Sequence, residues 1–308
     1  MQNSLRTSIY HHPDIALHDT EAQHVVMAGN RIESIGRAVL AVPGVQPVQA
    51  RPASRAELER VHAASFLDAL IHRTPTEKGR HFRIDSETIL NRHTWRAMEL
   101  SAGAACQAVD AVIDGIAINA FCPVYAGHHA QRQHAAGFCF INSVAIAALH
   151  AQYRGLTRVA VLDIDTHAGN GTILSVMDQP GILFAETYQP GYPGSFMPGY
   201  RPAQVLRERV TTAFEFRQAW PELLRQVEAF NPQLILVSAG FDAHENDPLG
   251  VVKLRDADYV KLATDILRIS PRVVACLEGG YDVATTARCA ALFVQQMVEA
   301  ATKDSSGG

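Results

Sequence analysis

The sequence predicts a single α/β domain in which a central, mostly parallel sheet carries helices on both faces. Short apolar runs alternate with longer amphipathic stretches along the chain, and most of these runs have no polar side, as in 159–162 and 234–237. Strands that are apolar on both faces are typical of parallel sheets covered by helices. No repeat or Pro/Gly/Ser-rich linker divides the 308 residues, so we expect one domain, although a prior of roughly 150 residues per domain would allow two.

Seven segments are expected to form strands. They share runs of apolar and β-branched residues that end at polar or turn residues, and they are 7–11, 45–50, 117–124, 158–165, 182–188, 233–240 and 272–278.

Helical periodicity fills the intervals between these strands. Ser54 with Glu57 three residues later is typical of a capping box and predicts a helix to about Ala64. Further helices are expected over 94–113, 142–153, 216–230, 256–269 and about 284–301. We expect residues 303–308 to form a flexible tail, which leaves 1–302 as the domain.

Composition excludes several classes of protein. Lys and Arg number 27 and Asp and Glu 31, a net charge of -4, so the chain has no basic field that would hold nucleic acid. No run of about 18 apolar residues predicts a membrane span, and the N-terminus does not resemble a secretory signal. The five cysteines are scattered and odd in number, which indicates reduced core thiols and predicts a cytoplasmic protein.

Polar residues follow four of the predicted strands, at the edge of the sheet where ligands of open α/β proteins bind. Asp163, Asp165 and His167 alternate along one strand end and can point to the same side. The other three strand ends supply His128 and His129, Asp242, and Tyr281. So many functional groups at successive strand ends indicate a site.

The residue types indicate metal-assisted amide hydrolysis. Asp165, His167 and Asp242 are ligands suited to a divalent metal that keeps open positions for water and substrate. Because two carboxylates neutralise a doubly charged ion, the bound water is acidified less than at a three-histidine site, and a separate base is needed. The His128–His129 pair can supply that base, and Tyr281 can donate its hydroxyl proton to a forming oxyanion.

Four blocks of sequence resemble the signature blocks of the zinc-dependent histone deacetylase superfamily, in the family's order. They are 127–130 with 137–139, 163–172, 239–243 with 247–250, and 278–281. The resemblance runs from about Ile9 to Ala300 and is nearest to bacterial class II-like deacetylases and acetylpolyamine amidohydrolases.

The resemblance implies an arginase-like α/β fold with one catalytic zinc ion, whose ligands would be Asp165, His167 and Asp242. His129 would act first as general base and then as acid, oriented by Asn170, while Asp163 would orient His128. Tyr281 would polarise the amide carbonyl of the substrate.

The resemblance also implies an acyl-lysine channel and a second cation. Channel walls would come from Gly137, Phe138 and Tyr192, with Leu249 at the rim. A structural potassium ion would lie near Asp163, Asp165 and His167. In the neighbouring strand 182–188, however, Glu186 and Tyr188 stand where the family often has a hydroxyl residue and a histidine.

The expected function is hydrolysis of the amide of acyl-lysine side chains or of related acylated amines, with an acylated lysine peptide or acylated small amine as substrate. Because Leu249 stands where some polyamine-selective relatives have an acidic residue, acyl-lysine substrates are favoured over polyamines. Three alternatives stay open: an acetylpolyamine or other small-molecule amidohydrolase, a ureohydrolase with two manganese ions, and a non-catalytic acyl-lysine binding module. The sequence leaves the oligomeric state open.

Overall fold

Buried apolar strands form one central sheet in the computed structural model, which describes residues 6–21, 30–191 and 204–304. Its strand order is β2-β1-β5-β10-β9-β6-β7-β8, and every neighbouring pair is parallel. The strands are β1 (Arg6–His11), β2 (Val45–Gln49), β5 (Ala117–Cys122), β6 (Val159–Asp163), β7 (Ile182–Tyr188), β8 (Val205–Arg209), β9 (Leu234–Ala239) and β10 (Val273–Leu277). All seven predicted strands are confirmed, and their bounds differ from the predicted ones by no more than two residues.

Strand β8 and the two-stranded sheet of β3 (Phe82–Arg83) and β4 (Ile89–Leu90) were not predicted. β8 is an edge strand that pairs with β7 and carries two arginines and a glutamate, so it lacks the apolar pattern of the inner strands. The sheet of β3 and β4 is two residues long on each side, too short for a period to be read.

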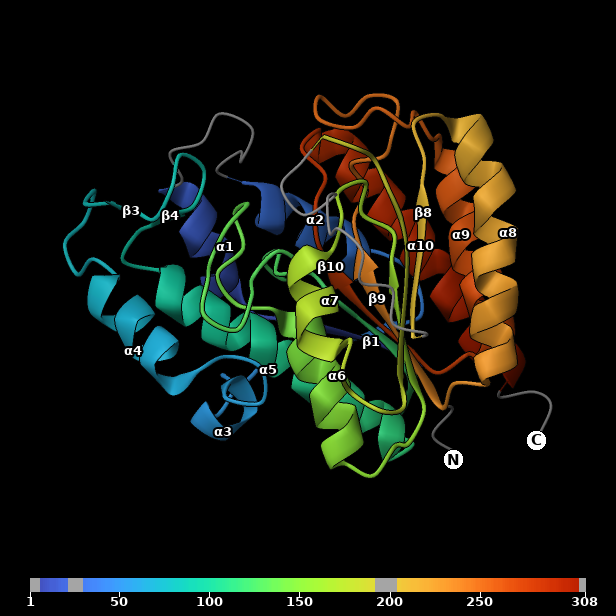
Figure 1. The fold of residues 1–308 in the computed structure, drawn as a ribbon, viewed down its shortest axis with the longest axis horizontal. Helices are drawn as coiled ribbons and strands as arrows, with labels where there is room; N and C mark the ends of the chain where they lie inside the picture. Colours follow the sequence, from blue (N-terminus) through green and yellow to red (C-terminus); the bar gives the residue numbers. More distant parts are fainter. Residues whose placement is uncertain (1–5, 22–29, 192–203, 305–308) are drawn as a thin grey trace.

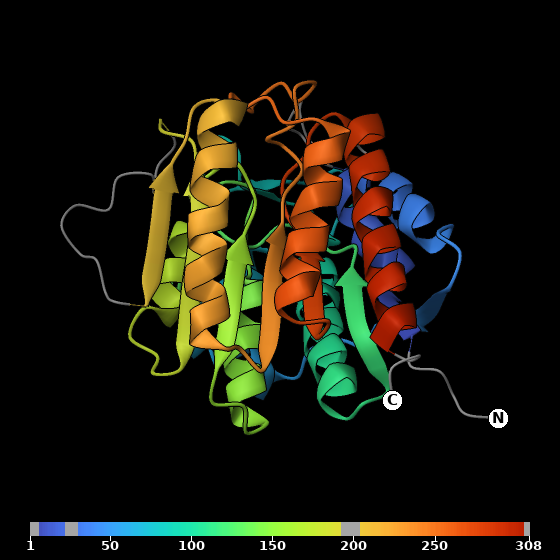
Figure 2. The same ribbon diagram turned by 90° about the vertical axis from the view of Figure 1, so that its right-hand side faces the viewer.

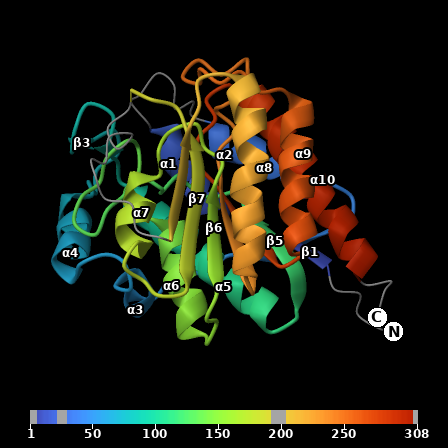
Figure 3. The same ribbon diagram turned by 45° about the vertical axis from the view of Figure 1, so that its right-hand side comes forward.

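Helices cover both faces of the sheet (Figures 1 and 2). Helices α8 (Ala213–Phe230), α9 (Asp256–Ile269) and α10 (Val283–Asp304) lie on one face, and α5 (Thr94–Ile113), α6 (Ser143–Tyr153) and α7 (Asn170–Val176) on the other. The remaining helices are α1 (Pro13–Thr20), α2 (Arg31–Leu40), α3 (Arg55–Leu58) and α4 (Ala64–Arg73). Figure 3 shows α3 and α4 outside the second layer, beyond α5 and α6. The predicted α/β class with helices on both faces is confirmed.

The capping box at Ser54 is present, but the helix predicted from it to Ala64 is wrong in length. The Ser54 side chain accepts a hydrogen bond from the backbone N–H of Glu57, yet α3 ends at Leu58. His62 explains the break, because its ring is buried, contacts the carbonyl of Gln131 at 3.0 Å and accepts from the backbone N–H of Asn142 at 2.9 Å. These tertiary bonds hold the chain out of the helix until α4 begins.

The C-terminal helix is longer than predicted, since α10 runs to Asp304 and so includes the first two residues of the expected tail. Residues 305–308 lie outside the described part of the chain. Among the helices of the described residues, none combines the length and the apolar composition that crossing a membrane requires.

Candidate active site

Three side chains converge where β6 and β9 end. Asp165 and His167 follow β6 and Asp242 follows β9, and one ligand atom of each lies within 4.8 Å of the others. Nδ1 of His167 is 3.1 Å from an Asp165 oxygen and 3.0 Å from an Asp242 oxygen. Backbone N–H groups orient both carboxylates, from Gly279 to Asp165 and from Thr166 to Asp242, each at 2.8 Å. All three side chains are buried.

The charge balance of this cluster fits a divalent cation. Burial alone would lower the pKa of His167, but hydrogen bonds to Asp165 and Asp242 outweigh it and raise the pKa to about 10. Burial and the charge of Asp165 raise the pKa of Asp242 to about 7. Two buried carboxylates that face one ring nitrogen are two negative charges in need of positive charge. Oxygen and nitrogen donors in this number suit a zinc ion with open positions.

Two other clusters of metal-ligating side chains occur among the described residues, and both already hold an arginine. They are Glu57 with Cys106 and His150, and Asp256 with His244 and Cys289. Arg51 donates two hydrogen bonds to the Glu57 carboxylate, and Arg288 donates two to that of Asp256. A guanidinium on the carboxylate supplies the charge that a metal would supply, so the Asp165 cluster is the best candidate metal site.

Two adjacent histidines lie next to the cluster in different electrostatic environments. His128 Nδ1 is 3.0 Å from an Asp163 oxygen, and His129 Nδ1 is 2.7 Å from the side-chain oxygen of Asn170. Burial lowers the pKa of His128, but the charges of Asp165 and Asp163 outweigh it and raise that pKa well above its usual range. Burial and the charge of His128 lower the pKa of His129 well below its usual range. The pair thus combines a charged and a neutral imidazole.

The segment that carries Tyr281 packs against the carboxylates without any side chain between. A Cβ on Gly279 would lie 2.3 Å from an Asp242 oxygen and 2.5 Å from an Asp165 oxygen, so only glycine fits. Arg31, fully buried, donates to the carbonyls of Gly280 and Glu278 and lies over the Tyr281 ring. These contacts hold in place the backbone that leads into Tyr281.

A pocket with a volume of about 170 Å³ leads to these groups. Its lining residues are Glu87, His129, Gly137, Phe138, His167, Leu249 and Tyr281. Gly137 and Phe138 both have positive φ, 56° and 67°, and a phenylalanine in this strained region is held there by its surroundings. The rings of Phe138 and Tyr281 lie 5.9 Å apart. The predicted wall residue Tyr192 lies outside the described residues.

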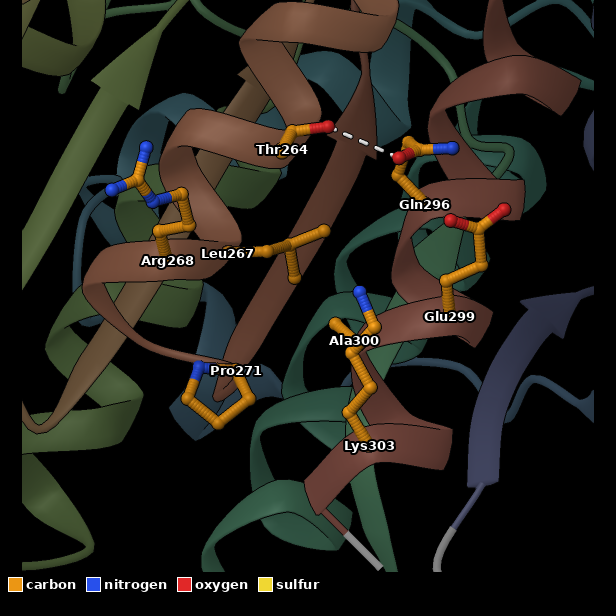
Figure 4. Close-up of a pocket in the computed structure, with 8 residues that line it drawn as sticks. All are labelled: Thr264, Leu267, Arg268, Pro271, Gln296, Glu299, Ala300 and Lys303. Carbon is orange, nitrogen blue, oxygen red and sulfur yellow. Dashed lines mark hydrogen bonds between the residues drawn. The ribbon is translucent and has the colours of Figure 1, made fainter.

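A second hollow, of about 380 Å³, lies between α9 and α10 and is shown in Figure 4. A hydrogen bond of 3.0 Å from Thr264 to Gln296 joins the two helices at one end of it, and Pro271, which comes just before β10, lies toward the other end. It therefore lies at the opposite edge of the sheet from the strand ends that carry the candidate metal ligands. None of its lining residues belongs to a metal-ligating cluster of the described chain.

The histone deacetylase domain family matches residues 24–297 of the chain. The chain belongs to the histone deacetylase family. It is 32% identical over 272 residues to mouse polyamine deacetylase HDAC10, and 33% identical over 279 residues to a histone deacetylase-like amidohydrolase of Pseudomonas aeruginosa. These alignments cover 80% and 83% of this chain but 40% and 72% of those proteins, so the chain spans less than half of the mouse relative.

The family's fold agrees with the architecture described above. The crystal structure of the HDA15 HD domain superposes on this chain with a TM-score of 0.89 and 25% sequence identity, over 96% of this chain and 90% of that one. The fold and the family resemblance predicted from sequence are therefore confirmed, whereas the roles assigned to individual site residues stay predictions.

The structure adds three residues that sequence reasoning did not assign to the site. Arg31 holds the backbone around Tyr281, and Glu87 lines the pocket from the loop between β3 and β4. Glu278 accepts hydrogen bonds from the backbone N–H groups of Gly127 and His128, at 2.6 and 3.1 Å. Glu278 had the clearest signal, because it ends a predicted strand and begins one of the four family-like blocks, and Arg31 lies in the segment 30–33, which resembles the family more weakly.

Proposed function

We propose that this chain is a zinc-dependent amidohydrolase that removes acyl groups from lysine side chains or from related acylated amines. One observation carries the proposal: the pocket of about 170 Å³ is lined together by the candidate ligand His167, the neutral His129 and the phenol of Tyr281. The relatives named as an amidohydrolase and a polyamine deacetylase support the same reaction class.

Asp165, His167 and Asp242 would hold the zinc ion. When bound, the ion would polarise the amide carbonyl and a water molecule. His129 would take the proton from that water and later deliver it to the leaving amine. With the Asn170 side-chain oxygen as acceptor, the single proton of neutral His129 lies on Nδ1, which leaves the lone pair of Nε2 as the base.

Tyr281 would donate its hydroxyl proton in a hydrogen bond to the developing oxyanion. Burial, followed by the charges of Asp242 and Asp165, raises its pKa well above the usual range, so the hydroxyl keeps its proton at any working pH. A donor that stays protonated suits this task.

The walls of the pocket support acyl-lysine as the substrate class. Phe138 and Leu249 give an apolar lining for a lysine's methylene chain. By the family resemblance, Leu249 stands where some polyamine-selective relatives have an acidic residue. Glu87 lies in the lining as well, and its carboxylate would favour a substrate with a nearby positive charge, which is the one feature of this lining that an acylated polyamine would match.

The metal cluster favours one ion over the two of a ureohydrolase. Of the described residues, the two neighbours of His167 in the sequence supply no ligand for a second metal ion. The hydroxyl of Thr166 donates to Gln189 at 3.0 Å, and residue 168 is alanine. The five buried, free cysteines support a reducing compartment, and we propose the cytoplasm.

A panel of substrates tests the proposed function. Zinc-loaded protein is assayed on acetyl-lysine and longer acyl-lysine peptides and on acetylated putrescine and spermidine, with metal content measured in the same sample. We expect one zinc per chain and the highest kcat/KM on an acyl-lysine peptide. A higher value on an acetylated polyamine would overturn the substrate class. Two metals per chain would favour the ureohydrolase, and binding without turnover would favour a binding module.

A further inference from the structure

A row of polar side chains runs under the site across three neighbouring strands. Asp163 on β6 is in register with Glu186 on β7, and Glu186 is in register with Arg207 on β8. Residues in register on parallel strands project from the same face of the sheet. The row therefore leads from the partner of His128 to the edge of the sheet.

Every carboxylate oxygen in this row already accepts a hydrogen bond. Arg207 donates from Nε to one oxygen of Glu186, and the backbone N–H of Gly169 donates to the other at 2.8 Å. Asp163 meets the backbone N–H of Asp165 with one oxygen and His128 with the other, at 3.1 and 3.0 Å. Each of the four carboxylate oxygens therefore already has a donor.

Burial makes the guanidinium of Arg207 a strong charge here. The Glu186 side chain is 1% exposed and that of Arg207 15%, and Arg207 also lies over the ring of Tyr188, 4.4 Å from its centre. A buried carboxylate without a counter-charge is costly, and Glu186 lies beside a second one in Asp163. Arg207 is the counter-charge of Glu186, whereas Asp163 has His128 as its partner.

This arrangement does not fit the potassium ion that the family resemblance implies near Asp163, Asp165 and His167. A potassium ion is held by oxygen donors, and Glu186, which stands where the family often has a hydroxyl residue, already has one oxygen on the guanidinium of Arg207 and the other on the N–H of Gly169. Because Arg207 already neutralises Glu186, a monovalent cation there would add a second positive charge for the same carboxylate in a poorly screened interior.

We propose that the Glu186–Arg207 pair replaces this cation, so that the chain needs no potassium for stability or activity. Through the Gly169 N–H, Glu186 would fix the loop that carries His167 and Asn170, and Arg207 would supply the positive charge. Both are positioning residues, since neither lines the pocket. The claim that activity is independent of potassium rests on the proposed function, whereas the claim that stability is independent of potassium does not.

Cation exchange tests this inference with two readouts. Thermal unfolding of the zinc-loaded protein and kcat/KM on its best acyl-lysine substrate are measured in KCl, NaCl and choline chloride at equal ionic strength. We expect the same Tm in all three salts and less than about twofold variation in kcat/KM. A Tm that rises in KCl alone, or a several-fold stimulation of the wild type by potassium over sodium, would overturn the inference.

Variants then test the pair itself. Glu186→Ser combined with Arg207→Met restores a hydroxyl and removes the guanidinium, and we expect the Tm and kcat/KM of this double variant to depend on KCl, with about tenfold stimulation over choline chloride. The matched control is Arg209→Met, which removes an exposed charge from the same strand and should stay independent of potassium. If the double variant unfolds at one Tm in all three salts, the pair does not replace a cation. The Tm series decides this even for a chain that turns over no substrate, which would refute only the proposed function.

Discussion

Removal of one oxygen atom from Tyr281 separates an enzyme from a binding module. Tyr281→Phe keeps the ring that packs 5.9 Å from the ring of Phe138 and leaves the three candidate metal ligands unchanged. The change removes the hydroxyl donor of Tyr281. This hydroxyl stays protonated because burial and the charges of Asp242 and Asp165 raise the pKa of Tyr281. The change therefore reports on the transition state alone.

The magnitude follows from the loss of a single oxyanion donor. Such a loss typically lowers kcat by about 10²–10³, or roughly 3–4 kcal/mol. Since Asp165 and Asp242 cancel most of the charge of a bound zinc ion, the phenol is the second electrophile, and the effect should lie in the upper half of that range. The acyl-lysine Kd should change no more than several-fold, because the apolar wall is kept.

The assay is steady-state deacylation at saturating substrate, with zinc content measured on each sample. Tyr259→Phe is the matched control, and it should leave kcat near the wild-type value. Tyr259 is fully buried, and its hydroxyl has no hydrogen-bond partner within the described residues. If Tyr281→Phe kept kcat within about threefold of wild type, the proposed mechanism would be wrong.

Three further changes have defined outcomes. Asp165→Ala or Asp242→Ala should lower zinc content and abolish deacylation, because two remaining ligands hold the ion weakly; full zinc occupancy would refute the ligand assignment. Arg31→Met should lower kcat about tenfold or more at unchanged zinc content, since it releases the carbonyls beside Tyr281; an unchanged kcat would show that the glycine pair holds Tyr281 without it. Glu57→Gln tests stability in acid. Burial raises the pKa of Glu57, but hydrogen bonds from Arg51 and Ser54 outweigh burial and lower this pKa to about 2. The ionised carboxylate therefore stabilises the fold fully above pH 4.5, and this contribution is lost as the pH falls toward 2. The free energy of unfolding of the variant should be about 1–2 kcal/mol lower than that of the wild type at neutral pH, a value that allows for the partial exposure of Arg51. In urea titrations this difference should vanish near pH 2. A difference that does not depend on pH would contradict the role given to the Glu57 carboxylate.

The sequence by itself determined the sheet and which polar residues meet at its edge. Strands that are apolar on both faces are an unambiguous local signal, so seven of the eight strands of the central sheet were predicted, and the missing one, β8, is the half-exposed edge. Because parallel strands end at one edge, the residues that follow them were predicted to meet there, and Asp165, His167 and Asp242 do.

Only the tertiary structure decided the contacts between residues far apart in sequence. Arg31 donates to the carbonyl of Gly280, 249 positions away in the sequence. The buried hydrogen bonds of His62 end the helix that the Ser54 capping box predicts to continue. The same is true of Glu186, because the partner of a single acidic residue in a strand cannot be predicted from the sequence. Only the pairing of β7 with β8 places Arg207 beside it. Local patterns specify which face of an element is buried, whereas the partner of a buried charge is specified by which strands become neighbours.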